Sequence, residues 1–155
     1  MSQPGEKWMA LGRAGYVAIL GAMAMLIGMA SASAEVRIRH DFGGQIGPYL
    51  HKYTAMREAG HRVVIDGPCL SACTLALAVI PRERICVTQN AVLGFHAAWM
   101  PGADGRPVTS PGGTRLLMAV YPQSVRSWIK RRGGLNGKTI FLRGRELTSL
   151  YRTCT

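Results

Sequence analysis

Residues 62–80 read RVVIDGPCLSACTLALAVI, and this stretch decides the fold. Its first five residues, Arg62 to Asp66, are rich in β-branched side chains, which is typical of a short buried strand. A Gly-Pro dipeptide follows and interrupts the strand. Ser71 to Ile80 then forms an apolar helix that ends at Pro81, and its uniform hydrophobicity indicates that it is covered on most sides. The stretch therefore predicts a strand that turns into a buried helix, with Ser71 at the turn.

Strand and helix patterns alternate on both sides of this stretch. The expected strands are Val36–His40, Arg84–Thr88, Ala91–Phe95 and Thr139–Leu142, and the expected helices are Ile46–Ala59, Thr114–Arg132 with an interruption at Pro122, and Arg145–Tyr151. Met100 to Gly113 carries Pro, Gly, Asp and Ser without periodicity, so we expect a loop of the length that often serves as a lid or a binding segment. The alternation predicts an α/β fold with a largely parallel sheet flanked by helices.

The first 34 residues differ from the rest of the chain. Two cations precede an uninterrupted run of apolar and small residues over 14–30, and Ala32-Ser33-Ala34 follows as a small-x-small cleavage site. This order predicts a secretory signal peptide over residues 1–34. An uncleaved membrane anchor over residues 14–30 is the alternative, because seventeen residues lie at the lower edge of what spans a bilayer. In both cases residues 35–155 are expected to be exported, as a periplasmic or secreted protein of one domain.

The exported part is strongly basic. Without Lys7, Arg13 and Glu6 it keeps 17 Lys and Arg against 7 Asp and Glu, a net charge of +10. This excess predicts attraction to anionic surfaces of the cell envelope, such as lipid headgroups or cell-wall polymers. We do not expect nucleic acid as a partner, because no nucleic-acid motif occurs and the one basic run, Lys130 to Arg132, fits the solvated end of a helix.

All four cysteines lie in the exported part, at Cys69, Cys73, Cys86 and Cys154. An even count in an oxidising compartment favours two disulfides. If the strand over 84–88 runs parallel to the strand over 62–66, Cys86 and Cys69 lie too far apart to be joined. A thiol–disulfide activity is a third-ranked hypothesis, because Cys-x-x-x-Cys lacks the Cys-x-x-Cys spacing of redox motifs.

No metal or other cofactor is expected. Cys69 and Cys73 have no second pair of Cys or His at the spacing of a zinc site, and His40, His51 and His61 are isolated in the sequence.

Chemistry is expected at Ser71 and His96, which lie 25 positions apart and each follow an apolar, strand-like run. A serine hydroxyl is a weak nucleophile until a neighbouring imidazole takes its proton. A serine at a strand-to-helix turn and a histidine at the end of a nearby strand therefore predict a serine hydrolase. Taken singly, each residue has a structural explanation: Ser71 as a helix N-cap and His96 as an interior histidine.

Three stretches in order resemble the Clp-protease-like branch of the crotonase superfamily, and the resemblance extends from residue 36 to about residue 151. The family's strand, Gly-Gly turn and helix resemble Asp41-Phe42-Gly43-Gly44 and the helix after it. Its Gly-x-x-x-Ser-Ala nucleophile turn resembles Gly67 to Ala72, and its histidine after a short strand resembles Ala91 to His96. The resemblance implies a crotonase-like fold.

The same resemblance implies roles for individual residues. Ser71 becomes the nucleophile and His96 the general base, while the backbone N–H groups of Gly44 and Ala72 form the oxyanion hole. It also implies a Cys86–Cys154 disulfide, because Cys154 falls where the chain returns beside the strand of Cys86. Cys69 and Cys73 are then left as a local pair or as two thiols.

The aspartate that completes the family's triad is missing. It belongs shortly before a strand–turn–helix that resembles Ile140 to Leu147, and this chain has Lys138-Thr139 there. Glu146 and Asp104 are the candidate substitutes, although Glu146 also fits a surface helix residue and Asp104 a turn residue.

Two main hypotheses follow. The first is an exported serine hydrolase that cleaves a peptide or ester bond through a Ser71/His96 dyad. The second is a non-catalytic binding or structural module of the cell envelope, which the absent aspartate and a domain shorter than is usual for the family support.

Overall fold

A computed structural model describes residues 34–155 of the chain. The predicted signal peptide over 1–34 lies outside the described residues except for Ala34, and the alternative anchor over 14–30 lies outside them entirely. Within the described part, no helix combines the length and the hydrophobicity needed to cross a membrane.

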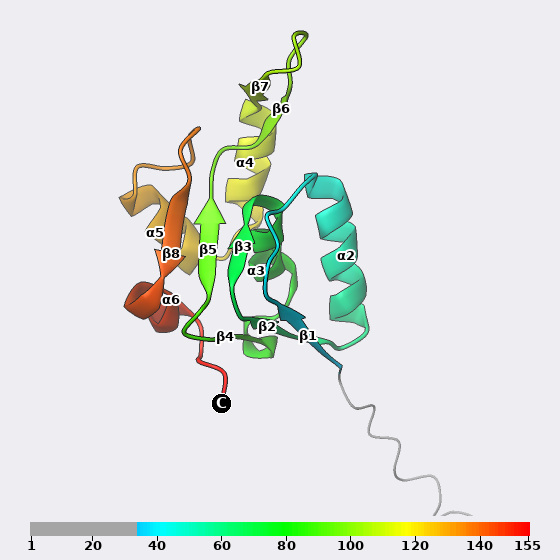
Figure 1. Cartoon of the computed structure of the whole chain (residues 1–155), viewed down its shortest axis with the longest axis vertical. Helices are drawn as coiled ribbons and strands as arrows, with labels where there is room; N and C mark the ends of the chain where they lie inside the picture. The colour runs from blue at the N-terminus through cyan, green and yellow to red at the C-terminus, as the bar shows by residue number, and fades with distance from the viewer. Residues whose placement is uncertain (1–33) are drawn as a thin grey trace, which may run out of the picture. The chain divides into compact units, whose positions relative to one another are not determined.

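Two three-stranded sheets organise the described residues (Figure 1). The first has the order β1-β2-β4, and all of its strands are parallel: β1 (Glu35–Ile38), β2 (Arg62–Ile65) and β4 (Ile85–Val87). The second has the order β3-β5-β8 and contains β3 (Pro68–Leu70), β5 (Val92–Phe95) and β8 (Ile140–Arg143). In this sheet β3 and β5 are parallel, whereas β8 runs antiparallel to β5.

In the described part of the chain, five helices and two short 3₁₀ turns accompany the sheets. The helices are α2 (Ile46–Glu58), α3 (Ala76–Val79), α4 (Pro111–Val120), α5 (Gln123–Arg131) and α6 (Gly144–Leu150), and the 3₁₀ turns are η2 (Ser71–Leu75) and η3 (Arg82–Arg84). The break between α4 and α5 falls at Tyr121-Pro122, as the sequence predicts, because proline cannot donate the backbone hydrogen bond that would continue a helix.

The mixed α/β class is confirmed, but the sheets are small and only partly parallel. The prediction of a largely parallel sheet is confirmed only in part. β8 returns antiparallel to β5, and two further strands, β6 (Trp99–Pro101) and β7 (Pro107–Thr109), form an antiparallel hairpin. Figure 1 shows this hairpin extending beyond the sheets, beside α4.

The hairpin replaces most of the loop that was predicted over Met100 to Gly113. Its turn is closed by the N–H of Gly102, which donates to the carbonyl of Arg106 at 2.8 Å, and by the N–H of Gly105, which donates to the carbonyl of Gly102 at 2.9 Å. The rest of the expected loop begins α4, where Ser110 accepts a hydrogen bond from the N–H of Gly113 at 3.2 Å.

The predicted helix over 71–80 also begins differently. Its first part is the 3₁₀ turn η2, and α-helical hydrogen bonding starts only at Ala76. The expected burial is confirmed, since residues 72 to 77 are all buried. Around them, the core gathers apolar side chains from both sheets, among them Val63, Ile65, Val87, Leu93 and Phe95.

Two disulfides close the described part, and no described cysteine is free. Cys86 and Cys154 are joined with their Cα atoms 5.0 Å apart, which confirms the pairing that the resemblance implied. Cys69 and Cys73 form the second, local disulfide, with Cα atoms 5.3 Å apart. β2 and β4 are parallel, with Val64 opposite Cys86, as the argument against a Cys69–Cys86 bond requires. Both bonds indicate an oxidising, exported environment.

Candidate active site

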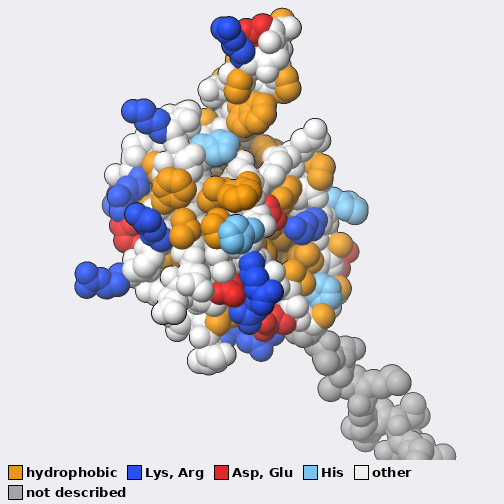
Figure 2. Space-filling model, in the orientation of Figure 1, with side chains coloured by type: hydrophobic (Ala, Val, Ile, Leu, Met, Phe, Trp, Pro, Cys, Tyr) orange, Lys and Arg blue, Asp and Glu red, His pale blue; other side chains and the backbone are white. Residues whose placement is uncertain are grey.

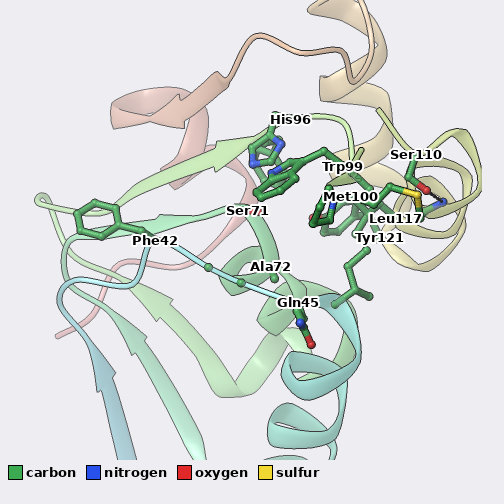
Figure 3. Close-up of a pocket in the computed structure, with 17 residues that line it drawn as sticks. Phe42, Gln45, Ser71, Ala72, His96, Trp99, Met100, Ser110, Leu117 and Tyr121 are labelled. Carbon is green, nitrogen blue, oxygen red and sulfur yellow. Dashed lines mark hydrogen bonds between the residues drawn. The ribbon is translucent and has the colours of Figure 1, made fainter. Parts of the chain in front are cut away.

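A pocket of about 620 Å³ opens where the ends of β3 and β5 meet the turn before α2, the hairpin and α4 (Figure 3). Most of its lining is apolar or aromatic, and none of the described residues that line it is Asp, Glu, Lys or Arg. The lining residues that matter for chemistry are Gly43, Gly44, Ser71, Ala72, His96 and Ser110. The structure therefore brings together the serine, the histidine and both backbone positions that the sequence singled out.

Ser71 occupies an unusual backbone conformation. Its φ is +54°, and it is the only described non-glycine residue with a positive φ. This left-handed region is unfavourable for residues with a Cβ, and such residues often lie at functional sites. The Ser71 hydroxyl makes no hydrogen bond to another described residue, and η2 has no side-chain cap. Helix capping therefore does not explain this serine.

Several restraints hold the turn in place. The Cys69–Cys73 disulfide joins the residues two positions before and two after Ser71. The hydroxyl of Thr74 donates to the carbonyl of Ser71 at 2.6 Å, and the buried hydroxyl of Tyr53 donates to the carbonyl of Cys73 at 3.0 Å. A conformation that is costly by itself can persist because the surroundings fix it in this way.

His96 follows the last residue of β5 and is half-buried at the pocket. Its Nδ1 lies 2.7 Å from the backbone carbonyl oxygen of Ala97. A carbonyl oxygen can only accept a hydrogen bond, so Nδ1 carries the hydrogen, and in the neutral ring the lone pair is then on Nε2. This is the tautomer that a general base needs at Nε2. Among the described residues, no hydrogen bond joins His96 directly to Ser71, a contact that is often loose in enzymes without substrate.

The Gly43-Gly44 turn lies against the Ser71 turn. A Cβ added at Gly43, which has a φ of +84°, would lie 2.7 Å from the Ser71 Cβ and 2.8 Å from the Ala72 nitrogen. The N–H of Gly43 donates to the Asp41 carboxylate at 2.9 Å, whereas the N–H of Gly44 has no acceptor among the described residues. Ala72 is in the first turn of η2, where N–H groups have no partner within the helix.

The structure does not bring either candidate acid to His96. Glu146 pairs with Arg132 on the surface, and this ion pair lowers the pKa of the Glu146 carboxyl. Asp104 lies at the tip of the β6–β7 hairpin, where it is 61% exposed and pairs with Arg106 at 3.5 Å. Neither residue lines the pocket.

Thr139, where the resemblance places the absent aspartate, lies near the strand that leads to His96. In the antiparallel pairing of β5 with β8, Phe95 is opposite Ile140, so Thr139 and His96 each lie one residue beyond this last pair. A Cβ built on Gly94, two residues before His96, would lie 3.2 Å from the Thr139 Cγ2.

Several pocket residues escaped the sequence analysis. Phe42, Trp99 and Met100 line the pocket although their side chains are largely exposed, and Tyr121 lines it from the end of α4. Figure 2 shows hydrophobic side chains gathered on one face of the molecule with Lys and Arg side chains around them. Ser110 could have been recognised from the sequence as a helix start, because a serine followed by proline is common there. The other residues reach the pocket only through the tertiary fold.

The Tyr121 hydroxyl links the far wall of the pocket to the serine turn. It lies 2.6 Å from the Thr74 hydroxyl, and Thr74 in turn donates to the carbonyl of Ser71. Burial raises the pKa of Tyr121 to about 12, so this phenol keeps its proton at neutral pH. The contact makes the end of α4 part of the support of the Ser71 turn.

Metal ligation finds no support in the described part of the chain, where no group of three or more His, Cys, Asp or Glu side chains is arranged to hold an ion. Comparison with family models and with curated proteins gave no match to the chain.

Proposed function

We propose that residues 35–155 form an exported, periplasmic or secreted serine hydrolase that cleaves a peptide or ester bond by acyl transfer. The observation that carries the proposal is the left-handed backbone of Ser71, whose hydroxyl has no structural partner among the described residues and shares a pocket with His96. Strain at a serine in a pocket is explained by a need to present its hydroxyl. A crotonase-like fold of the Clp-protease-like type fits this arrangement.

The mechanism assigns each group one task. Ser71 Oγ attacks the substrate carbonyl while its proton passes to Nε2 of His96. The N–H groups of Gly44 and Ala72 stabilise the oxyanion, and His96 then gives the proton to the leaving amine or alcohol as the bond to carbon breaks. A water molecule then attacks the acyl carbon while its proton passes to His96, and His96 returns that proton to Ser71 Oγ as the carbon–Oγ bond breaks and the acid product leaves.

The carbonyl of Ala97 takes over part of the role of the absent aspartate. It fixes the tautomer and the orientation of His96 through the 2.7 Å contact to Nδ1. A neutral carbonyl stabilises an imidazolium less than a carboxylate does, and replacing the aspartate of a characterised triad by asparagine costs about 10⁴ in rate. We therefore expect slow turnover.

The test is covalent labelling of the purified exported protein with a fluorophosphonate, followed by peptide mapping. Labelling of Ser71 that disappears in Ser71→Ala and falls in His96→Gln supports the hydrolase. Ser110→Ala is the matched control, because Ser110 lines the same pocket but serves as a helix cap. A folded protein that shows no labelling, or labelling at Ser110 instead, contradicts the proposal.

The second candidate is a non-catalytic module that binds an anionic surface of the envelope. It is favoured by the lack of a described carboxylate beside His96 and by the net charge of +10 over residues 35–155. Such a module would leave Ser71 unlabelled and co-sediment with vesicles that contain anionic lipid. Its binding would weaken as salt is raised, because salt screens the charges.

A further inference from the structure

Asp41 connects the two halves of the candidate oxyanion hole through its backbone. It follows β1 and forms an isolated parallel bridge with Cys69. The N–H of Asp41 donates to the carbonyl of Pro68 at 2.9 Å, and its carbonyl accepts from the N–H of Leu70 at 2.8 Å. Asp41 is therefore fixed to β3, directly before Ser71.

The carboxylate of Asp41 holds the Gly43-Gly44 turn and the start of α2. Its Oδ1 accepts hydrogen bonds from the N–H of Gly43 at 2.9 Å and from the hydroxyl of Tyr49, while Lys52 Nζ lies 3.5 Å from Oδ2. The side chain is only 16% exposed. Burial, together with the bond to Asp41, raises the pKa of Tyr49 to about 12, so Tyr49 remains the donor at neutral pH.

These contacts determine which glycine N–H can donate to a molecule bound in the pocket. The N–H of Gly43 is occupied by Asp41, so the next N–H in the turn, that of Gly44, is the one without a described acceptor. The turn cannot shift far, because Gly43 already packs against Ser71 and Ala72.

We propose that Asp41 is a positioning residue that orients the Gly44 N–H toward the oxyanion formed at Ser71. This inference rests on the proposed function, and it adds a residue that the Gly-Gly motif itself does not contain. Asp41 touches neither substrate nor Ser71 directly, and its effect passes through the Gly43 hydrogen bond. Losing an oxyanion donor lowers kcat by about 10²–10³ with little effect on KM, since the donor acts mainly on the transition state.

The test compares three variants of Asp41 with p-nitrophenyl butyrate as substrate. Asp41→Ala and Asp41→Leu remove the acceptor, and we expect kcat to fall at least about tenfold while KM changes less than about threefold. Asp41→Asn keeps an amide oxygen that can accept from Gly43, and we expect it to retain most of the activity. Recovery by asparagine separates hydrogen-bond positioning from the carboxylate charge.

Asp66 is the matched control. Its side chain is 17% exposed and accepts hydrogen bonds from Thr88 at 2.7 Å and from Arg37 at 3.2 Å, but it does not line the pocket. Asp66→Ala should lower the thermal unfolding midpoint and leave the kcat of the folded protein unchanged.

The outcomes distinguish the two proposals. If the wild type is folded but neither turns over the ester nor labels at Ser71, the hydrolase proposal fails. If the wild type labels at Ser71 and Asp41→Ala or Asp41→Leu keeps its kcat, only the role of Asp41 is overturned. The positioning role is also rejected if both variants unfold, or if Asp41→Asn is as slow as Asp41→Ala.

Discussion

Replacing Gly43 by alanine tests the contact between the glycine turn and the serine turn. Gly43 and Gly60 both have left-handed backbones, with φ of +84° and +75°. A Cβ at Gly43 would lie 2.5 Å from the Leu70 carbonyl oxygen and 2.7 Å from the Ser71 Cβ, whereas a Cβ at Gly60 would meet nothing within 4 Å. The two substitutions therefore share a conformational cost and differ in a steric one.

The magnitudes follow from this difference. A left-handed backbone costs a residue with a Cβ roughly 1–2 kcal/mol, and this is the whole loss expected for Gly60→Ala. Insertion of a methyl group into a tightly packed site adds about 1–3 kcal/mol, so Gly43→Ala should lose about 2–5 kcal/mol. Urea denaturation with both disulfides intact measures the free energies of unfolding.

Equal losses at the two glycines would refute the packing of Gly43 against the serine turn. A functional measurement can accompany the stability measurement. In the fraction that stays folded, Gly43→Ala should slow fluorophosphonate labelling of Ser71, because the Leu70, Ser71 and Ala72 backbone must move to admit the methyl group. Gly60→Ala should label at the wild-type rate.

Three further predictions use the same geometry. Thr139→Asp should raise ester turnover by about tenfold or more, since a carboxylate there can stabilise the His96 imidazolium, whereas Thr139→Asn should not. If Glu146 or Asp104 already serves as the acid, Thr139→Asp should change little and Glu146→Gln or Asp104→Asn should abolish turnover. Ser71→Gly should be more stable than Ser71→Ala in urea denaturation, the reverse of the usual order, because glycine tolerates a φ of +54°. Replacing both cysteines of the Cys86–Cys154 pair by alanine should lower the free energy of unfolding by about 4 kcal/mol, and replacing those of Cys69–Cys73 by about 2 kcal/mol. The difference is expected because the loops that the two bonds close span 68 and 4 positions. Comparable losses in urea denaturation would contradict this loop-entropy argument.

Local patterns were sufficient where neighbouring residues determine the structure. The β-branched run over 62–65 forms β2, and the Tyr121-Pro122 break separates α4 from α5, as expected. The hairpin was missed because its pairing places Pro101 opposite Pro107, and prolines and glycines are typical of loops. The loop prediction treated these residues as breakers, although two short strands around a Gly-rich turn contain the same residue types.

The residues proposed to carry out the chemistry could be predicted from the sequence, but the residues that surround and support them could not. Ser71, His96 and the glycine turn follow from short motifs, each attached to one strand end. Trp99, Tyr121 and Asp41 could not be assigned to the site, because their places depend on contacts between elements that are distant in sequence. Tyr121, for example, meets Thr74 across 47 positions.

The conformation of Ser71 has the strongest bearing on function. The structure restrains this turn with a disulfide, two hydroxyl-to-carbonyl hydrogen bonds and the Thr74–Tyr121 contact. A serine that only filled space would not need a left-handed backbone, since a glycine would form the same turn at lower cost. The side chain must therefore contribute something that glycine lacks, and the Oγ, in the pocket that Ser71 shares with His96, is the only reactive group it adds. This reasoning favours the hydrolase over the binding module even though the third member of the triad is absent.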